Sequence, residues 1–521
     1  MRSALRIASA RGVAICCVVA LGSGWSLARA GDKWIEARSD NFVIFSDAGE
    51  NRTRELVVEL EKFRFVVEQI TPVQYPAVEN DRPLTVFAYD STRNYVKQTG
   101  MNGTAGVYVS RTTGAVSVLS LEEAEEIWQL DGREVLLHEY THHLLHHYSG
   151  AHYPRWYDEG FAEFMAAIEF DDDEVILGHP AVHRFLVLRN VGEWVDIETI
   201  IESKGRYLGD LSSGLSRDPN KYKLGMPYQY AQGWLLTHML HAREKLRPAL
   251  ARYLRELSMN PEASEEIFER AFGMPYREMG RLLREYWSAG ELPLLAVGLK
   301  DVFREPELLV RELSEQEADL IHDFARIRSG LGKHGRGMRK RLERALEAGF
   351  RPARMHEFLA RFHLRDERPE RAAPHVDYLL AKRPDSALGP ILKMSQIMMA
   401  ADDDDPQPQA RLEAMCQQAI AIAPDDGEAL LNCVRVDLRE AGTVDSQTLD
   451  RIMRVRRQFP DVSVARVLEL KTLIELERFA VAEARARQYV GWASSRDEAN
   501  RFEKFQREAE VRSTERSSPD S

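Results

Sequence analysis

The spacing of hydrophobic residues divides the chain into a mixed first part and a helical second part. Residues 31–125 contain short apolar runs rich in β-branched and aromatic residues, which predict strands. These runs lie at 41–46, 84–89, 107–109 and 115–119. The run between residues 53 and 70 has the helical period instead, since every third or fourth residue is apolar. We therefore expect a small α/β subdomain, with a hairpin around residues 111–114.

Residues 126–295 have mainly helical periodicity, apart from a weakly patterned stretch at 175–225 that we expect to be a long loop. From residue 296 onward no strand is expected. Four prolines in this last part recur at intervals of 32, 40 and 36 residues, between apolar-periodic runs: Pro352, Pro384, Pro424 and Pro460. We predict helical repeats over 296–511, with a plain helical bundle as the alternative. The tail, 512–521, is polar and is expected to be disordered.

The first thirty residues have the pattern of a secretory signal peptide. Arginines precede the apolar run at 13–21, and the small residues at 27–30 fit a cleavage site before Gly31. The apolar run is short for a transmembrane helix, and no later stretch is long and apolar enough to span a bilayer. Export is therefore predicted, most simply to the periplasm, with secretion or an uncleaved N-terminal anchor as alternatives.

The net charge of the chain limits the classes of molecule that we expect it to bind. The formal net charge is −12, and cleavage after residue 30 removes four arginines and no acid, which makes it −16. An acidic exported protein is poorly suited to bind nucleic acid or an anionic membrane surface. Only two cysteines remain after cleavage, Cys416 and Cys433. An oxidising compartment permits a disulfide between them, and two buried thiols are the alternative.

A short motif within the predicted helices suggests metal chemistry. His138 and His142 are four residues apart, so a helix projects both imidazoles from one face. Glu139 leaves the helix about 100° further round, where it can reach a water molecule on an ion held by the two histidines. His146 continues the stripe and is most simply a helix-end histidine near the C-terminal dipole.

The next helical run offers a third ligand. Sixteen residues separate His142 from Glu159, which is enough for a turn and a second helix that crosses back over the first. A catalytic zinc usually has three protein ligands and one water. Glu163 lies one turn beyond Glu159, where a carboxylate could accept the other ring N–H of a ligand histidine. The alternative for this pair is two solvated carboxylates, which repel each other slightly at that spacing.

The motifs His-Glu-x-x-His at 138–142 and Trp-x-x-Glu-Gly-Phe-Ala-Glu at 156–163 resemble the gluzincin metallopeptidases. These include the thermolysin and aminopeptidase N families and, closer still, bacterial peptidase MA-like domains. The resemblance covers residues 34–290 and implies an α+β fold with a small mixed sheet and a zinc-binding helical subdomain at 126–295. It also implies one Zn²⁺ per chain, held by His138, His142 and Glu159, and peptide hydrolysis with Glu139 as general base.

The resemblance extends to an oxyanion donor. In aminopeptidase-like gluzincins, a Tyr followed by x-x-Gly begins a helix and donates its hydroxyl to the tetrahedral intermediate. Tyr230 and Gly233 match this pattern, which assigns Tyr230 a catalytic role. A packed tyrosine at a helix start is the alternative. Other candidates for the same role are Tyr222, Tyr228, His238 and His241.

Two further features concern the substrate. Gluzincins bind the substrate backbone at an edge strand, and residues 115–119 are the best candidate because they precede the metal helix. An interior strand is the alternative for this segment. The acidic motif with which aminopeptidases hold a free amine has no counterpart here, so an endopeptidase is favoured.

The repeats at 296–511 resemble degenerate tetratricopeptide repeats, whose concave face commonly binds peptides or proteins. Two functions compete. The first is an exported zinc endopeptidase whose repeats select a protein or peptide substrate. The second is an inactive metallopeptidase-like domain that serves as a tetratricopeptide adaptor for a protein partner. An intact Glu139 favours the first.

Overall fold

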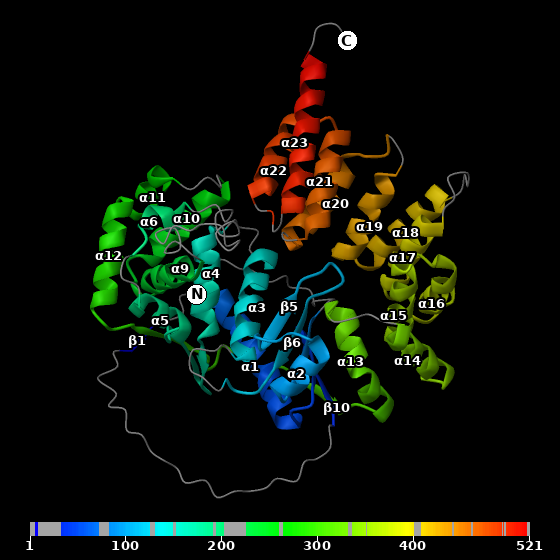
Figure 1. Ribbon diagram of the computed structural model, residues 1–521, viewed down its shortest axis with the longest axis horizontal. Helices are drawn as coiled ribbons and strands as arrows, with labels where there is room; N and C mark the ends of the chain where they lie inside the picture. Colours follow the sequence, from blue (N-terminus) through cyan, green and yellow to red (C-terminus); the bar gives the residue numbers. More distant parts are fainter. Residues whose placement is uncertain are drawn as a thin grey trace, which may run out of the picture.

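The computed structural model is an α+β fold with two β-sheets and a long helical C-terminal region (Figure 1). The structure describes residues 6–8, 33–71, 83–124, 131–148, 153–190, 194–202, 226–259, 264–331, 336–350, 352–400, 408–439, 442–459, 462–491, 493 and 496–517. No helix in these segments combines the length and apolarity that crossing a membrane requires.

Six strands form the larger sheet, in the order β10-β2-β3-β4-β6-β5. Their bounds are β2 Ile35–Arg38, β3 Phe42–Ser46, β4 Leu84–Tyr89, β5 Gly106–Val109, β6 Val116–Ser120 and β10 Leu309–Glu312. Strands β3, β4 and β6 are parallel neighbours, and the other pairs are antiparallel. Ile44 and Phe45 belong to cores on opposite faces of the sheet. Because both faces are buried, the central strands are apolar almost throughout.

Helices cover both faces of this sheet. One face packs against α1 (Glu50–Ile70) and α3 (Gly132–Tyr148), in a core that extends into the helical lobe. The helices on the other face are α2 Thr92–Thr99, α13 Glu315–Ser329, α14 Arg336–Glu347 and α15 Ala353–Arg365. Three of these four helices, and strand β10, lie beyond residue 296. The expectation that strands end there is wrong, and the boundary predicted at 296 cuts β9 (Leu294–Gly298).

The helical lobe contains a second, antiparallel sheet in the order β1-β9-β8-β7. Its other strands are β1 Arg6–Ala8, β7 Glu169–Phe170 and β8 Glu174–Leu177. The lobe's helices are α4 Arg155–Ala166, α5 Val182–Asn190, α6 Ile197–Ile201, α9 Met226–Ala242, α10 Arg247–Met259, α11 Glu265–Phe272 and α12 Tyr276–Ser288. The long loop expected at 175–225 is therefore wrong for 175–190 and 194–201, which contain β8, α5 and α6, whereas 191–193 and 203–225 lie outside the described residues. The residues of the predicted signal peptide likewise lie outside the described residues, apart from β1.

Helices α13 to α23 follow an arc beside the sheet (Figure 1). Beyond α15 they are α16 Pro369–Lys382, α17 Leu388–Ala400, α18 Pro408–Ile422, α19 Gly427–Asp437, α20 Ser446–Gln458, α21 Ser463–Glu475, α22 Phe479–Gly491 and α23 Arg496–Ser517. Each packs on the next, and the odd-numbered helices α15, α17, α19 and α21 also contact each other in a row. The arc closes back on helix α3, which α20 contacts.

Pro352, Pro384 and Pro424 precede α15, α17 and α19, as the repeat period predicts, and Pro460 lies outside the described residues. Cys416 and Cys433 form a disulfide that joins α18 to α19. The terminal helix α23 continues to Ser517. Disorder of the tail is thus wrong up to this residue, because the polar segment is helical.

Candidate metal centre

Helix α3 directs His138 and His142 away from the core because its opposite face is buried. Leu137, Tyr140 and Leu144 are buried against the sheet and α1. The helix begins with a reciprocal cap, in which the Glu134 N–H donates to Asp131 Oδ1 and the Asp131 N–H donates to Glu134 Oε2. His138 and His142 therefore lie half-buried on the side that faces α4.

Two glycines bring α4 into place against α9. A Cβ at Gly160 would lie 2.5 Å from the Gly233 carbonyl oxygen and 2.6 Å from Thr237 Oγ1. A Cβ at Gly233 would lie 2.9 Å from the Trp156 carbonyl oxygen. The two helices touch through their backbones, which no larger residue permits. Glu159, next to this contact, is thereby held over α3.

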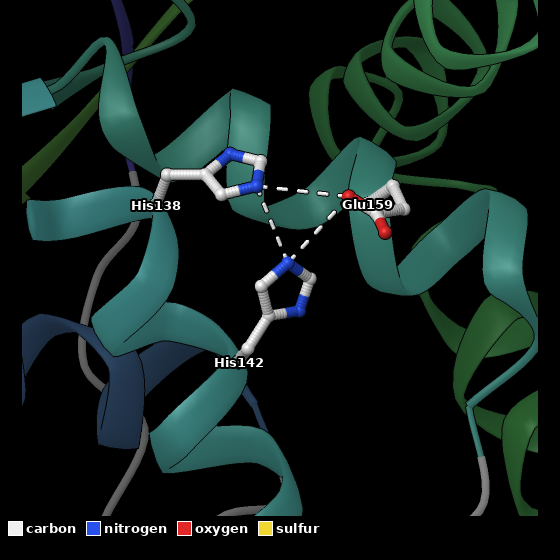
Figure 2. Close-up of side chains that lie close together, drawn as sticks. All are labelled: His138, His142 and Glu159. Atoms are coloured by element: carbon white, nitrogen blue, oxygen red, sulfur yellow. Dashed lines mark hydrogen bonds and ion pairs between the residues drawn. The ribbon is translucent and has the colours of Figure 1, made fainter. Parts of the chain in front are cut away.

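The three predicted ligands converge (Figure 2). His138 Nε2 and His142 Nε2 are 3.3 Å apart, and each lies 3.6 Å from Glu159 Oε2. A tetrahedral ion with bonds of about 2.0–2.1 Å separates two of its ligand atoms by about 3.3–3.4 Å. Two imidazoles and one carboxylate are also a common donor set of catalytic zinc. The three side chains therefore fit a single zinc ion.

Asp158 orients the second ligand. His142 Nδ1 lies 2.9 Å from Asp158 Oδ1, and His146 Nε2 lies 2.8 Å from the same oxygen. Burial alone would raise the pKa of Asp158, but the charges and hydrogen bonds of His146 and His142 hold it well below its usual range. His142 Nε2 is thus left to face the ion, as expected for a carboxylate behind a ligand histidine. His146 is therefore part of this network, and not only a helix-end residue.

Glu163 does not have the role predicted for it. Its Oε1 is 3.8 Å from His138 Nδ1, which is too long for a hydrogen bond. It accepts two hydrogen bonds from Arg184, and His183 Nε2 lies 2.9 Å from its other oxygen. Burial opposes ionisation, but His183 and Arg184 lower the pKa of Glu163 to about 2. Asp158, immediately before Glu159, takes the orienting position, and the sequence analysis missed it.

The charges around Glu159 favour its anionic form. Burial would raise the pKa of Glu159, but hydrogen bonds from His138 and His142 hold it well below its usual range. Burial likewise opposes a charged His142, yet Asp158 and Glu159 raise the pKa of His142 well above its usual value. The same carboxylates that would bind a cation therefore also attract protons to this site.

Tyr230 lies beside the ligand set. Its hydroxyl donates to Glu159 Oε1 at 3.3 Å and accepts from Arg155 Nη2 at 2.6 Å. Burial and the charge of Glu159 raise the pKa of Tyr230, so the hydroxyl keeps its proton. Glu139 follows His138 on α3 and is partly exposed.

The other candidates for the oxyanion donor are less suitable. His238 is buried, with Nδ1 2.7 Å from the Tyr286 hydroxyl and Nε2 2.9 Å from the Gly178 carbonyl oxygen. His241 is buried with Nε2 3.2 Å from the Tyr157 hydroxyl. Both histidines therefore serve the core of the lobe. Tyr228 is partly exposed at the start of α9, and Tyr222 lies outside the described residues.

Helix α3 contacts both β5 and β6, and of these two strands β5 is the one at the edge of the sheet. The predicted segment 115–119 falls largely in β6, which pairs with β4 on one side and β5 on the other. The interior alternative for this segment is therefore correct. A Cβ at Gly106 would lie 3.1 Å from Val135 of α3, and the rings of Tyr108 and His143 are 5.9 Å apart. Strand β5 thus runs along α3 at the edge of the sheet.

Comparison of the chain with models of protein families and with curated proteins finds no match. The resemblance to gluzincins, which depends on two short motifs, therefore stays a prediction. What the site can do has to be argued from its donor atoms, its charges and the strand beside it.

Proposed function

We propose that this protein is a zinc-dependent peptidase that hydrolyses peptide bonds within proteins or peptides. One observation carries the proposal: three donor atoms from two helices lie 3.3 and 3.6 Å apart, the spacing of ligands around a tetrahedral ion. A structural zinc site usually has four protein ligands, whereas three leave one position open for chemistry. Glu139 supplies a carboxylate on the same helix as two of the ligands.

His138, His142 and Glu159 would hold the ion, with Asp158 fixing the tautomer of His142. When bound, zinc supplies Lewis acidity that polarises the scissile carbonyl and makes water a stronger nucleophile near neutral pH. Glu139 accepts the proton of the attacking water and passes it to the leaving amine.

Tyr230 stabilises the negative oxygen that develops on the scissile carbonyl. Its O–H points to Glu159 over a long 3.3 Å hydrogen bond, so little is lost when it donates to the new oxyanion instead. The Arg155 guanidinium donates to the same hydroxyl at 2.6 Å, which orients the hydroxyl and offsets part of the rise in its pKa. This donor acts mainly in the transition state, where it contributes most to the rate.

Two features support a polypeptide substrate in an oxidising compartment. Strand β5 lies at the sheet edge beside α3, where an extended peptide can pair with its backbone. The disulfide between Cys416 and Cys433 fits an exported protein, in agreement with the predicted signal peptide. We propose a periplasmic location on these grounds.

The test combines metal analysis with hydrolysis of an unfolded generic protein. The purified wild-type protein should contain one zinc per chain and cleave the substrate. Glu139→Gln should keep its zinc and lose roughly 10²–10⁴-fold in rate, because general base catalysis contributes that much. His142→Ala should lose both zinc and activity.

His179→Ala is the matched control, since His179 is half-exposed and pairs with Glu169 at 2.9 Å. It should keep zinc and full activity. A Glu139→Gln variant as fast as the wild type would refute the peptidase. A zinc-bound wild type that cleaves no unfolded substrate would favour the adaptor instead.

A further inference from the structure

A cavity of about 810 Å³ lies where the tip of the β5–β6 hairpin meets the helical arc. The hairpin contributes residues 110–113, and the arc contributes α13, α15, α17 and α19. The last three belong to the row of odd-numbered helices that contact one another, so they line the inner side of the arc. The volume matches that of sites for drug-sized ligands, which leaves room for several peptide residues.

The cavity is cationic although the chain as a whole is acidic, with a formal charge of −12. Among the described residues that line the cavity, the only carboxylate is Glu357. Five arginines line the same cavity: Arg111, Arg328, Arg361, Arg365 and Arg435. A concentration of guanidinium groups against the sign of the net charge indicates an anionic ligand.

Two of these arginines already have carboxylate partners. Arg361 makes two hydrogen bonds to Glu428, at 2.7 and 2.9 Å, and one to Glu357 at 3.0 Å. Arg365 lies 3.7 Å from Asp366. The Arg361–Glu428 pair joins α15 to α19, and both pairs leave less positive charge for a ligand than the number of arginines suggests.

Arg111 and Arg435 have neutral partners instead. The Arg111 guanidinium donates to the Ser329 carbonyl oxygen at 3.0 Å, and Arg435 donates to Asn432 Oδ1 at 3.3 Å. Neither forms an ion pair with a carboxylate of the described residues. Burial lowers the pKa of Arg435, and the charge of Glu428 only partly offsets this. Both guanidinium groups keep donors for an incoming carboxylate.

The rest of the lining is apolar and adaptable. Met398 and Met399 at the end of α17 line the cavity together with Phe358 and Leu392. Met399 is exposed, at 46% of its full area. Methionine side chains adjust to ligands of different shape. Cations next to methionines suit a segment in which acidic and apolar residues alternate, and suit a free phosphate less well.

The cavity also continues the edge strand. Strand β5 runs along α3, with Tyr108 close to His143, and the hairpin turn that follows Val109 forms one wall of the cavity. An extended chain paired with β5 therefore leads from the metal helix to Arg111 at the hairpin tip. Since β6 is paired on both sides, β5 is the strand of this hairpin that can accept such a chain.

We propose that this cavity binds an acidic, apolar-containing segment of the protein substrate, at a distance from the bond that is cleaved. The carboxylates pair with Arg111 and Arg435, and a neighbouring apolar side chain packs on Met398 and Met399. The identity of this ligand as substrate rests on the proposed peptidase function, whereas its binding does not require zinc. The arc thereby selects protein substrates by charge, and the metal centre does not need to recognise a particular amino-acid sequence at the cleaved bond.

The experiment measures binding of a fluorescent peptide in which Glu and Asp alternate with Leu and Phe. The protein is the full chain carrying Glu139→Gln, both zinc-loaded and after chelation. Arg111→Gln/Arg435→Gln removes two charges and keeps an amide donor at each position. The control is Arg281→Gln/Arg487→Gln, which removes two charges from exposed arginines of α12 and α22, at 61% and 68% exposure.

The peptide should bind with and without zinc, more weakly as salt increases, and at least tenfold more weakly to the Arg111/Arg435 variant. The control variant and the parent should bind it equally. In the active enzyme, Arg111→Gln/Arg435→Gln should raise KM at least tenfold for a substrate that carries the acidic segment, with kcat unchanged. Zinc content should not change.

Four results would overturn the proposal: no binding of the acidic peptide, equal binding of a peptide with Lys in place of the acids, equal binding by the Arg111/Arg435 variant, or preferential binding of anionic phospholipid vesicles through the same arginines. If the peptide binds as expected but Glu139→Gln does not slow hydrolysis, the proposed peptidase function is refuted while the cavity proposal stands. The cavity would then be the peptide-binding site of an adaptor.

Discussion

Replacement of Asp158 by Asn tests how the metal centre is built. The imidazoles of His142 and His146 approach the same oxygen, Asp158 Oδ1. Asn can keep an acceptor in that place and remove only the charge. Loss of such a partner typically weakens metal binding by 10- to 100-fold. We therefore expect the zinc dissociation constant to rise by about that factor, or roughly 1.4–2.7 kcal/mol.

Glu163→Gln is the matched comparison. Its carboxylate is 3.8 Å from His138 Nδ1 and is engaged instead by Arg184 and His183. Zinc affinity should change little, while the metal-free protein should lose about 1.5–3 kcal/mol of stability, since a buried charged hydrogen bond is broken. The two variants should therefore separate metal affinity from stability.

The assay titrates zinc into chelator-treated protein in competition with a chromogenic chelator. Thermal unfolding of the metal-free proteins is measured in parallel. Our account of the site would be refuted if Asp158→Asn bound zinc as tightly as the wild type while Glu163→Gln bound it 10-fold more weakly. In that case Glu163 would be the orienting carboxylate, as its position in the motif first suggested.

Three further outcomes are expected. Tyr230→Phe should lower kcat by roughly 10²–10³-fold while zinc content and KM are retained, and Tyr228→Phe should be as active as the wild type. Equal activity of the wild type and both variants would exclude Tyr230 as the oxyanion donor. The zinc dissociation constant should rise as pH falls, beginning above the usual pKa of histidine, because the raised pKa of His142 lets protons compete for its nitrogen; the dissociation constant measured against pH checks this, and a constant value down to pH 4 contradicts it. The double substitution Cys416→Ser/Cys433→Ser should cost about 3 kcal/mol of stability for a loop spanning 17 residues, measured by denaturant unfolding, with hydrolysis of an unfolded substrate unchanged.

The central part of the site could be predicted because its geometry is local. Residues four apart on any helix share a face, so the pairing of His138 and His142 needs no tertiary information. The period of the apolar runs likewise predicts the strands at 41–46 and 84–89, observed as β3 and β4, and the helices of the arc. Glu159 was predicted from its spacing and from a resemblance, and the structure brings it within 3.6 Å of both imidazoles.

The errors concern relations between distant segments. Sequence spacing placed Glu163 behind a ligand, but Arg184 and His183, on α5, attract its charge away from α3. The expectation that no strand occurs beyond residue 296 was wrong for a related reason. The polar strand β10 pairs with β2, which lies more than 200 residues earlier in the chain, and the weak apolar pattern of β10 gives no sign of this partner.

The sequence by itself determined which residues can act as metal ligands and as a base, because these depend on side-chain chemistry and on periods of a few residues. Only the tertiary structure decided which carboxylate meets which imidazole, that β5 and not β6 is the open edge, and that the arc meets the hairpin tip in a cationic cavity. Strand order and helix contacts join residues that are far apart in the chain. They depend on how whole faces of helices and sheets pack together. At Gly160 and Gly233 the two helices approach so closely that an added Cβ would lie 2.5 and 2.9 Å from a carbonyl oxygen, and no residue pattern specifies such a fit.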